Sequence, residues 1–148
     1  MKKIIQCLFL MAMMVSCTPK ENNDNVRAEL MQFHDQLMMD NETIIGNQMK
    51  LDTLLRDMKG IKTKNPTIDT VKEKELINKM LVRLTRAEDQ MNDWMHNFNA
   101  DFKDPSPEAT LQYFKAEREK IAAIAKAYQQ EINSSNVYLK QRNNEKPN

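Results

Sequence analysis

Two histidines and several methionines are the residues of this chain whose side chains could bind a soft metal ion or haem iron. Imidazole and thioether groups are soft ligands that suit Cu(I), and a His–Met pair can hold haem iron at its two axial positions. A site of this kind needs residues that lie far apart in the sequence to meet in space. The candidate ligands are His34, Met38, Met91, Met95 and His96.

Their spacing predicts such a meeting. Two long helical segments flank a turn centred near Asn65, with His34 placed 31 residues before it and His96 placed 31 residues after it. In an antiparallel helical hairpin, residues equidistant from the turn stand at the same height. A second turn near Asp104 should bring Tyr113 to the same level. We therefore expect one end of the molecule to gather the histidines, the methionines and Trp94.

Ordinary core packing explains the same residues without a ligand. Met91 and Trp94 fall on an apolar helical seam, where methionine fills irregular gaps and tryptophan can seal the end of a bundle while its N–H reaches a partner. His96 falls on the outward side of its helix and His34 at the edge of the seam. This interpretation is favoured, so we expect no cofactor, and a copper or haem site is the alternative.

A catalytic role has less support. His34 and Asp35 could pair as a base and its orienting carboxylate, but adjacent helical residues point about 100° apart. The chain has no HExxH motif, and no serine or cysteine nucleophile has a natural place beside them. We expect the protein not to be an enzyme.

The amino terminus has the layout of an export signal. Met1-Lys2-Lys3 is positively charged, residues 4–15 are apolar apart from Gln6, and Ser16 precedes Cys17. The apolar run matches a signal peptide and is shorter than the roughly 20 residues that cross a membrane. Residues 1–16 are therefore predicted to be a cleaved signal peptide, followed by a polar linker over residues 17–25.

Met14-Val15-Ser16-Cys17 resembles a lipobox, which implies a diacylglycerol and further acyl chains such as palmitate on Cys17. Several acyl chains make a stable membrane anchor. Thr18 follows, in place of the Asp that retains enterobacterial lipoproteins in the inner membrane, so we expect anchoring in the outer membrane. The periplasmic leaflet and the cell surface both remain open. Since Cys7 leaves with the signal, no free thiol remains for chemistry.

Composition predicts one all-α domain. The mature chain of 132 residues has 20 basic and 21 acidic residues, a net charge of −1, and no basic stripe of the kind that binds nucleic acid. With only two glycines in the whole sequence and abundant Lys, Glu, Gln, Met and Leu, it favours helices over tight hairpins.

Heptad spacing of apolar residues predicts an antiparallel up-down-up three-helix bundle over residues 26–141, with coiled-coil-like packing and a frayed tail over 142–148. The first helix should run over 26–59, the second from Thr70 to about 99–103, and the third from Pro107. An extended, dimeric coiled coil is the alternative. The heptad rows of the first two helices are Leu30, Leu37, Ile44, Leu51 and Met58, then Ile77, Leu84, Met91 and Phe98. The buried stripe of the third helix is Leu111, Phe114, Ile121, Ala125, Tyr128, Ile132 and Leu139.

Local signals place the helix ends. Gly60 should end the first helix in a left-handed conformation, and Thr70 with Glu73 should form a capping box on the second. Ser106 should cap the third, with Pro107 in its first turn.

Polar residues interrupt the seam of the first helix. Asp40 and Asn47 occupy positions where apolar residues are expected, and they would form either a buried polar layer or a face open to solvent, the second being slightly favoured.

Asp69-Thr70-Val71 and Asp52-Thr53-Leu54 resemble the Asp-Thr-apolar acceptor of Bacteroidota O-glycosylation. Thr70, at the start of a helix, is expected to be the more accessible of the two threonines.

The segment Asp93-Trp94-Met95-His96-Asn97-Phe98, together with Phe33-His34-Asp35, resembles a group of small Bacteroidota lipoproteins labelled viral A-type inclusion proteins. The resemblance implies lineage, lipidation and helical structure, and it implies no chemistry.

The sequence thus favours a non-catalytic envelope lipoprotein that acts as a helical interaction or structural module. Its partners would be the lipid bilayer, through Cys17, and a protein, an envelope polymer or a second copy. The alternative is a periplasmic binder of copper or haem.

Overall fold

A computed structural model describes residues 21–144 of the chain, and these residues form four helices: α1 (Asn23–Arg56), α2 (Met58–Lys64), α3 (Thr70–Asn97) and α4 (Pro107–Asn144). The predicted all-α class is confirmed, whereas the three-helix bundle is not, because the described residues form four helices. None of these helices is long and apolar enough to cross a membrane. The predicted signal peptide, Cys17 and residues 145–148 lie outside the described residues.

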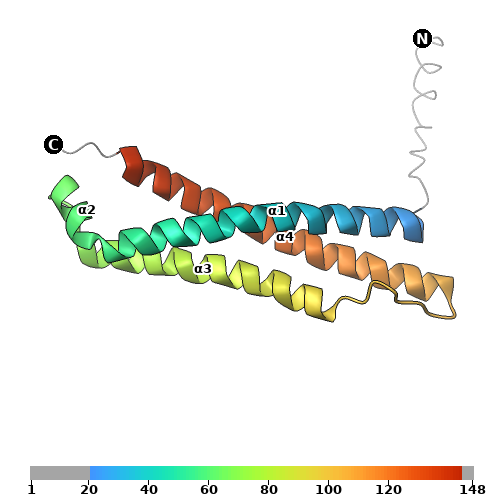
Figure 1. Cartoon of the computed structure of the whole chain (residues 1–148). Helices are drawn as coiled ribbons and strands as arrows, with labels where there is room; N and C mark the ends of the chain where they lie inside the picture. Colours follow the sequence, from blue (N-terminus) through green and yellow to red (C-terminus); the bar gives the residue numbers. More distant parts are fainter. Residues whose placement is uncertain (1–20, 145–148) are drawn as a thin grey trace, which may run out of the picture.

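The three long helices lie side by side in alternating directions, and the short α2 sits at one end of them (Figure 1). Helix α1 packs most extensively on α4 and also contacts α3. The described chain therefore starts at one end, beside the connection between α3 and α4. Helix α2, the start of α3 and the end of α4 lie at the other. At 1.5 Å per residue, the 34 residues of α1 span about 50 Å between these ends.

The core follows the predicted heptad rows. Every member of the first row is buried, from Leu30 in α1 to Met58 in α2. The residues predicted for the core of α3 and α4 are also buried, except for Phe98, Leu111 and Ala125, which are partly covered. Other apolar residues flank these rows. Of these, Ile45 and Met95 are largely exposed, whereas Leu55 and Leu81 are partly buried.

Helix α1 begins at Asn23, three residues earlier than predicted, so residues 23–25 are helical although they were expected to belong to the linker. The side chain of Asn22 accepts a hydrogen bond from the backbone N–H of Asn25 at 2.9 Å, which is a standard N-cap. Helix α4 in turn runs three residues past its predicted end at 141. Arg142 forms an ion pair with buried Glu73 at 3.2 Å, so residues 142–144 are not frayed.

The predicted helix stop at Gly60 is wrong. Helix α1 ends at Arg56, and Gly60 lies inside α2 with an ordinary negative φ. The carboxylate of Asp57 caps α2 by accepting a hydrogen bond from the N–H of Gly60 at 3.0 Å. A Cβ atom at position 60 would overlap that carboxylate. A larger residue at position 60 would therefore displace the Asp57 carboxylate from its capping position.

The starts of the other helices are placed correctly, but the predicted cap of α3 is wrong. Asp69, and not Thr70, caps α3 by accepting hydrogen bonds from the N–H groups of Lys72 and Val71, and the bond from Lys72 is the main reason that the pKa of Asp69 is lowered. At α4 the hydroxyl of Ser106 accepts from the N–H of Ala109 at 3.3 Å, which confirms the predicted cap.

A buried polar layer crosses the bundle where the sequence slightly favoured an open face. Asn47 is only 2% exposed and donates hydrogen bonds to Ser135 Oγ at 2.8 Å and Asn136 Oδ1 at 2.9 Å. The open-face expectation is therefore wrong for Asn47, because α4 supplies two acceptors that the pattern of α1 alone could not reveal. Asp40 is half-buried and accepts from Gln129 at 2.6 Å.

Candidate functional site

An aromatic cluster fills the bundle near the end where the described chain starts. The rings of Trp94 and Phe98 stack with their centres 4.7 Å apart, and Phe102 stacks on Tyr113 at 4.1 Å. The hydroxyl of Tyr113 also accepts from the backbone N–H of Asn99 at 2.8 Å. These contacts hold the connection between α3 and α4 against both helices.

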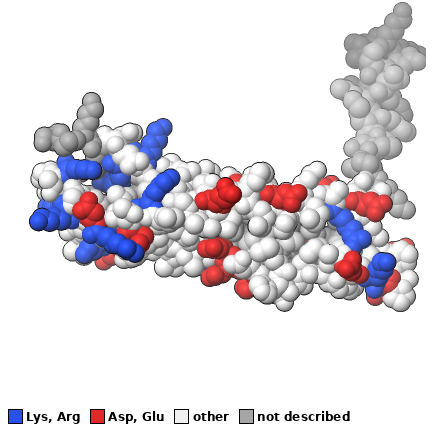
Figure 2. Space-filling model, viewed as in Figure 1, with Lys and Arg blue, Asp and Glu red and all other residues white. Residues whose placement is uncertain are grey.

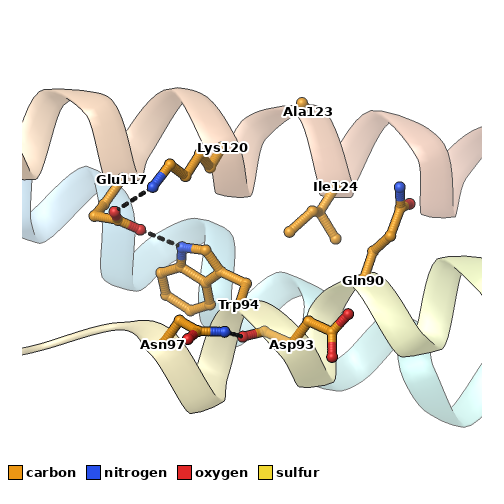
Figure 3. A pocket seen from close by; sticks show the side chains of 8 residues that line it. All are labelled: Gln90, Asp93, Trp94, Asn97, Glu117, Lys120, Ala123 and Ile124. Atoms are coloured by element: carbon orange, nitrogen blue, oxygen red, sulfur yellow. Dashed lines mark hydrogen bonds and ion pairs between the residues drawn. The ribbon is translucent and has the colours of Figure 1, made fainter.

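Trp94 is joined to α4 through a buried carboxylate. Its indole Nε1 donates to Glu117 Oε2 at 2.9 Å, and Lys120 Nζ lies 2.7 Å from Glu117 Oε1 (Figure 3). Both oxygens of the buried Glu117 are therefore engaged, one by a neutral donor and one by a cation. The expectation that the indole N–H of Trp94 reaches a partner is confirmed.

A shallow groove of about 560 Å³ opens between α3 and α4 beside this hydrogen bond. Figure 3 shows Trp94 and Ile124 in it, with the polar side chains of Gln90, Asp93 and Asn97 along the α3 side. Phe98 covers one face of the indole, and Glu117 is already bonded to Trp94 and Lys120. The polar groups along the groove are therefore mainly the amides of Gln90 and Asn97 and the carboxylate of Asp93.

The predicted histidine ligands stand on the surface of the bundle. His34 lies with its ring centre 6.5 Å from that of Trp94, which confirms its place at the edge of the seam. His96 is exposed, and its Nδ1 lies 2.8 Å from the backbone carbonyl of Asn92 in the same helix. Between residues 21 and 144, no three His, Cys, Asp or Glu side chains lie close enough together to hold a metal ion.

The predicted methionine ligands do not share one environment. Met91 is 2% exposed in the core, whereas Met38 is 47% exposed and Met95 is also on the surface. Met91 is thus a packing residue, and the structure leaves only Met38 and Met95 open to a ligand.

His34 and Asp35 do meet, contrary to the argument from helical angles. His34 Nδ1 lies 3.1 Å from Asp35 Oδ1, because the short carboxylate folds back along the helix surface. Asp35 is largely exposed, so water competes for the pair and its electrostatic contribution is small.

The two candidate glycosylation acceptors are exposed in the opposite order to the one expected. Thr70 is partly buried, whereas Thr53 is exposed on α1, although its hydroxyl donates to the carbonyl of Met49 at 2.8 Å. Since Asp69 caps α3, a sugar on Thr70 would not compete with the cap.

Charge is strongly segregated along the bundle. We call residues 50–79 and 139–144 the basic tip; they carry ten Lys and Arg against five Asp and Glu, a net charge of +5. The rest of the described chain carries eight basic and 15 acidic residues, a net charge of −7. Figure 2 shows most of the visible basic side chains at the end of the bundle that holds α2, acidic ones along the middle, and both kinds at the opposite end.

The basic tip has a groove of its own. It has a volume of about 350 Å³ and is lined by Met58, Lys59, Lys62, Thr63 and Thr70. Lys62 Nζ donates to the carbonyl of Ile68 at 2.7 Å, so it is held beside the groove. The ammonium groups of Lys59 and Lys62 and the hydroxyl of Thr70 are donors suited to an anionic oxygen, whereas the hydroxyl of Thr63 donates to the carbonyl of Lys59 at 3.0 Å.

Sequence reasoning missed two buried carboxylates. Glu117 occupies a position on α4 that faces inward between Phe114 and Ile121 of the apolar row, and this placement was the signal that could have revealed it. Glu73 was assigned to a capping box, but it is buried and accepts from Tyr138 Oη at 2.5 Å. Both act as structural acceptors within the bundle.

No protein-family model, curated protein or solved structure matches this chain, so its function has to be argued from its own residues.

Proposed function

We propose that the protein is a non-catalytic envelope lipoprotein whose helices form an interaction or structural module. Acyl chains on Cys17 would hold it in the outer membrane. Helices α1, α3 and α4 would act together as an antiparallel, coiled-coil-like three-helix bundle, with α2 as its cap. The observation that carries the proposal is the separation of the start of α1, to which a lipid on Cys17 would be tethered, from the basic tip by the full length of the bundle.

Chain length limits where the anchor can reach. Cys17 lies six residue steps before Asn23 at the start of α1, and six steps of fully extended chain cover at most about 20 Å. The bundle is about 50 Å long, judged from α1. The acyl chains would therefore lie near the start of α1, and the basic tip is the part of the fold best placed to meet a partner away from that bilayer.

Copper or haem binding by His34, Met38, Met95 and His96 is the weaker alternative. His96 Nδ1 is engaged by a carbonyl of its own helix, and Met91 is buried in the core. Titration of the purified lipoprotein with haem and with Cu(I), beside the His34→Ala and His96→Ala variants, tests it. Saturable binding that both variants abolish would favour the alternative over the interaction module.

Two measurements in cells test the proposed function. Metabolic labelling with a palmitate analogue, followed by membrane fractionation, should show a labelled, membrane-bound wild type and an unlabelled Cys17→Ser variant. A photoreactive amino acid in place of Lys64 in the basic tip should then give crosslinks to a partner, with the same probe at the exposed Gln112 as control. Labelling of Cys17→Ser, or no crosslink from the tip, would contradict the proposal.

A further inference from the structure

We propose that the basic tip binds an anionic polymer of the cell envelope, one that displays closely spaced phosphate or carboxylate groups. This inference rests on the proposed function only for the direction in which the tip faces. The binding itself follows from the charges, the groove and the shape of the described chain.

The basic tip carries lysines whose ammonium groups take part in none of the ion pairs of the described residues. Within the described residues, no ion pair involves Lys59, Lys64 or Lys74, and all three are exposed. Lys59, Lys62 and Lys64 lie within six residues of one helix, so they are separated by no more than about 8 Å along its axis. This spacing is comparable with the Debye length at physiological ionic strength, so the three charges act together on a polyanion.

The groove beside these lysines provides a binding position for one anionic group of the polymer. Lys59, Lys62 and Thr63 line its α2 side, and Thr70 lines its α3 side. The Thr63 hydroxyl already donates to the carbonyl of Lys59 at 3.0 Å, so the two ammonium groups and the hydroxyl of Thr70 are the donors for an anion. Its volume of about 350 Å³ admits a phosphate or carboxylate with part of the unit that carries it. Neighbouring groups of the same polymer would then meet Lys64 and Lys74 outside the groove, which explains why a polymer fits better than a single ion.

The charge of the remaining bundle argues against an anionic lipid surface as the partner. To place the whole rod on a bilayer, the protein would have to bring its body, with a net charge of −7, against lipid headgroups of the same sign. Helix α1 is the clearest case, since residues 28–49 contain four acidic residues and no lysine or arginine. Only the tip is attractive to an anionic surface.

The same segregation argues against a second copy. Two anchored copies standing side by side would place two tips of +5 next to each other. An antiparallel pair would match tip to body, but it would hold the two anchors about 50 Å apart, on opposite sides of the pair. Neither arrangement suits two molecules in one bilayer.

Binding of labelled polymers to the purified, detergent-solubilised lipoprotein tests the inference. The probes are long-chain inorganic polyphosphate for phosphate and polygalacturonate for carboxylate, with phosphatidylglycerol-containing vesicles as the lipid surface. The test variant is Lys59→Gln, Lys62→Gln and Lys64→Gln combined. The matched control is Arg86→Gln, Lys103→Gln and Lys126→Gln, which removes the same charge from exposed positions outside the tip. Circular dichroism checks that both variants remain helical.

Wild type should bind at least one of the two polymers, and raising the salt should weaken that binding. The tip variant should bind about tenfold or more weakly at low salt. The binding constant of the tip variant should also fall less steeply with salt. In a plot of log binding constant against log salt concentration, the slope should be shallower by about 0.7–0.9 for each anionic group that a lysine no longer neutralises. The control should stay within about twofold of wild type. If only one of the two polymers binds, its anionic group is the one that the groove selects.

Three outcomes would overturn the inference: no polymer binding by wild type, an equal loss in both variants, or binding to vesicles alone. None of them would touch palmitate labelling of Cys17 or crosslinking in cells. The failure of this inference is therefore distinguishable from the failure of the proposed function.

Discussion

Glu117→Ala tests whether the carboxylate between Trp94 and Lys120 holds α3 and α4 together. The substitution leaves the indole N–H of Trp94 without its acceptor at a position that is 7% exposed. A hydrogen bond to a charged group contributes about 1.5–3 kcal/mol, and its buried donor then lacks a partner. The pair with Lys120 adds less than about 1 kcal/mol, because the lysine is 62% exposed.

We therefore expect Glu117→Ala to lower the free energy of unfolding by about 2–3 kcal/mol, as expected for an orphaned buried donor. Glu117→Gln keeps an oxygen that can accept from Trp94 and should lose only about half as much, since a neutral acceptor is roughly half as strong. For a domain of this size, each kcal/mol corresponds to about 3–6 °C in the melting temperature.

Urea unfolding is a direct assay, because Trp94 is the only tryptophan in the chain and its fluorescence reports on the site itself. Glu119→Ala is the matched control, since Glu119 is exposed two residues further along α4. It should change stability by less than about 0.5 kcal/mol. If Glu117→Ala and Glu119→Ala had the same effect, the reasoning about the buried carboxylate would be refuted.

Three further predictions concern other parts of the bundle. Asn47→Ala removes two buried hydrogen bonds to α4 and should cost about 1–3 kcal/mol in urea unfolding. Gly60→Ala should be nearly neutral in wild type, where the new Cβ displaces the cap, but should stabilise the Asp57→Ala variant by about 0.5–1 kcal/mol through helix propensity. Burial, with charges of Glu88 and Asp40, raises the pKa of Tyr128 from 10.0 to about 12. The protonated Tyr128 side chain therefore contributes fully to stability below about pH 10. As the pH rises from about 10 to about 12, this contribution falls by roughly 1.4 kcal/mol per pH unit, measured against the Tyr128→Phe variant.

Each of these has a result that would count against it. Asn47→Ala should cost clearly more than Asn92→Ala, an exposed control on α3. The effect of Gly60→Ala should depend on Asp57, so equal values in both backgrounds would rule out the clash. The free energies of unfolding of wild type and Tyr128→Phe should differ in their pH dependence only above about pH 10. If the two plots of free energy against pH stayed parallel there, Tyr128 would ionise as readily in the folded state as in the unfolded chain.

Apolar periodicity predicted the core well because each helix carries its own seam. Leu37, Ile44 and Leu51 recur every seventh residue and are fully buried. Features that depend on a second helix could not be predicted in this way. Asn47 is buried because α4 brings Ser135 opposite it, and no pattern within α1 contains that information.

The candidate sites were harder to predict for a different reason. Equal distance from a turn predicts height along a bundle, but not the direction in which His34 or His96 points. The basic tip was missed because the chain as a whole is almost neutral, with a net charge of +1, and the average conceals an excess of lysine and arginine over residues 50–79. Charge has to be counted along the folded rod before the segregation becomes visible.

The central claim is that the protein is anchored at one end and presents its basic tip away from the membrane. Since Cys17 would be the only cysteine of the mature chain and would carry lipid, a new cysteine can be labelled selectively. Donor dyes at Asp24→Cys, near the start of α1, and at Lys64→Cys, in the tip, can be compared by energy transfer to acceptor lipids in reconstituted vesicles. Efficient transfer from position 24 and weak transfer from position 64, about 50 Å further along the bundle, is the predicted result. Equal transfer from both positions would contradict it.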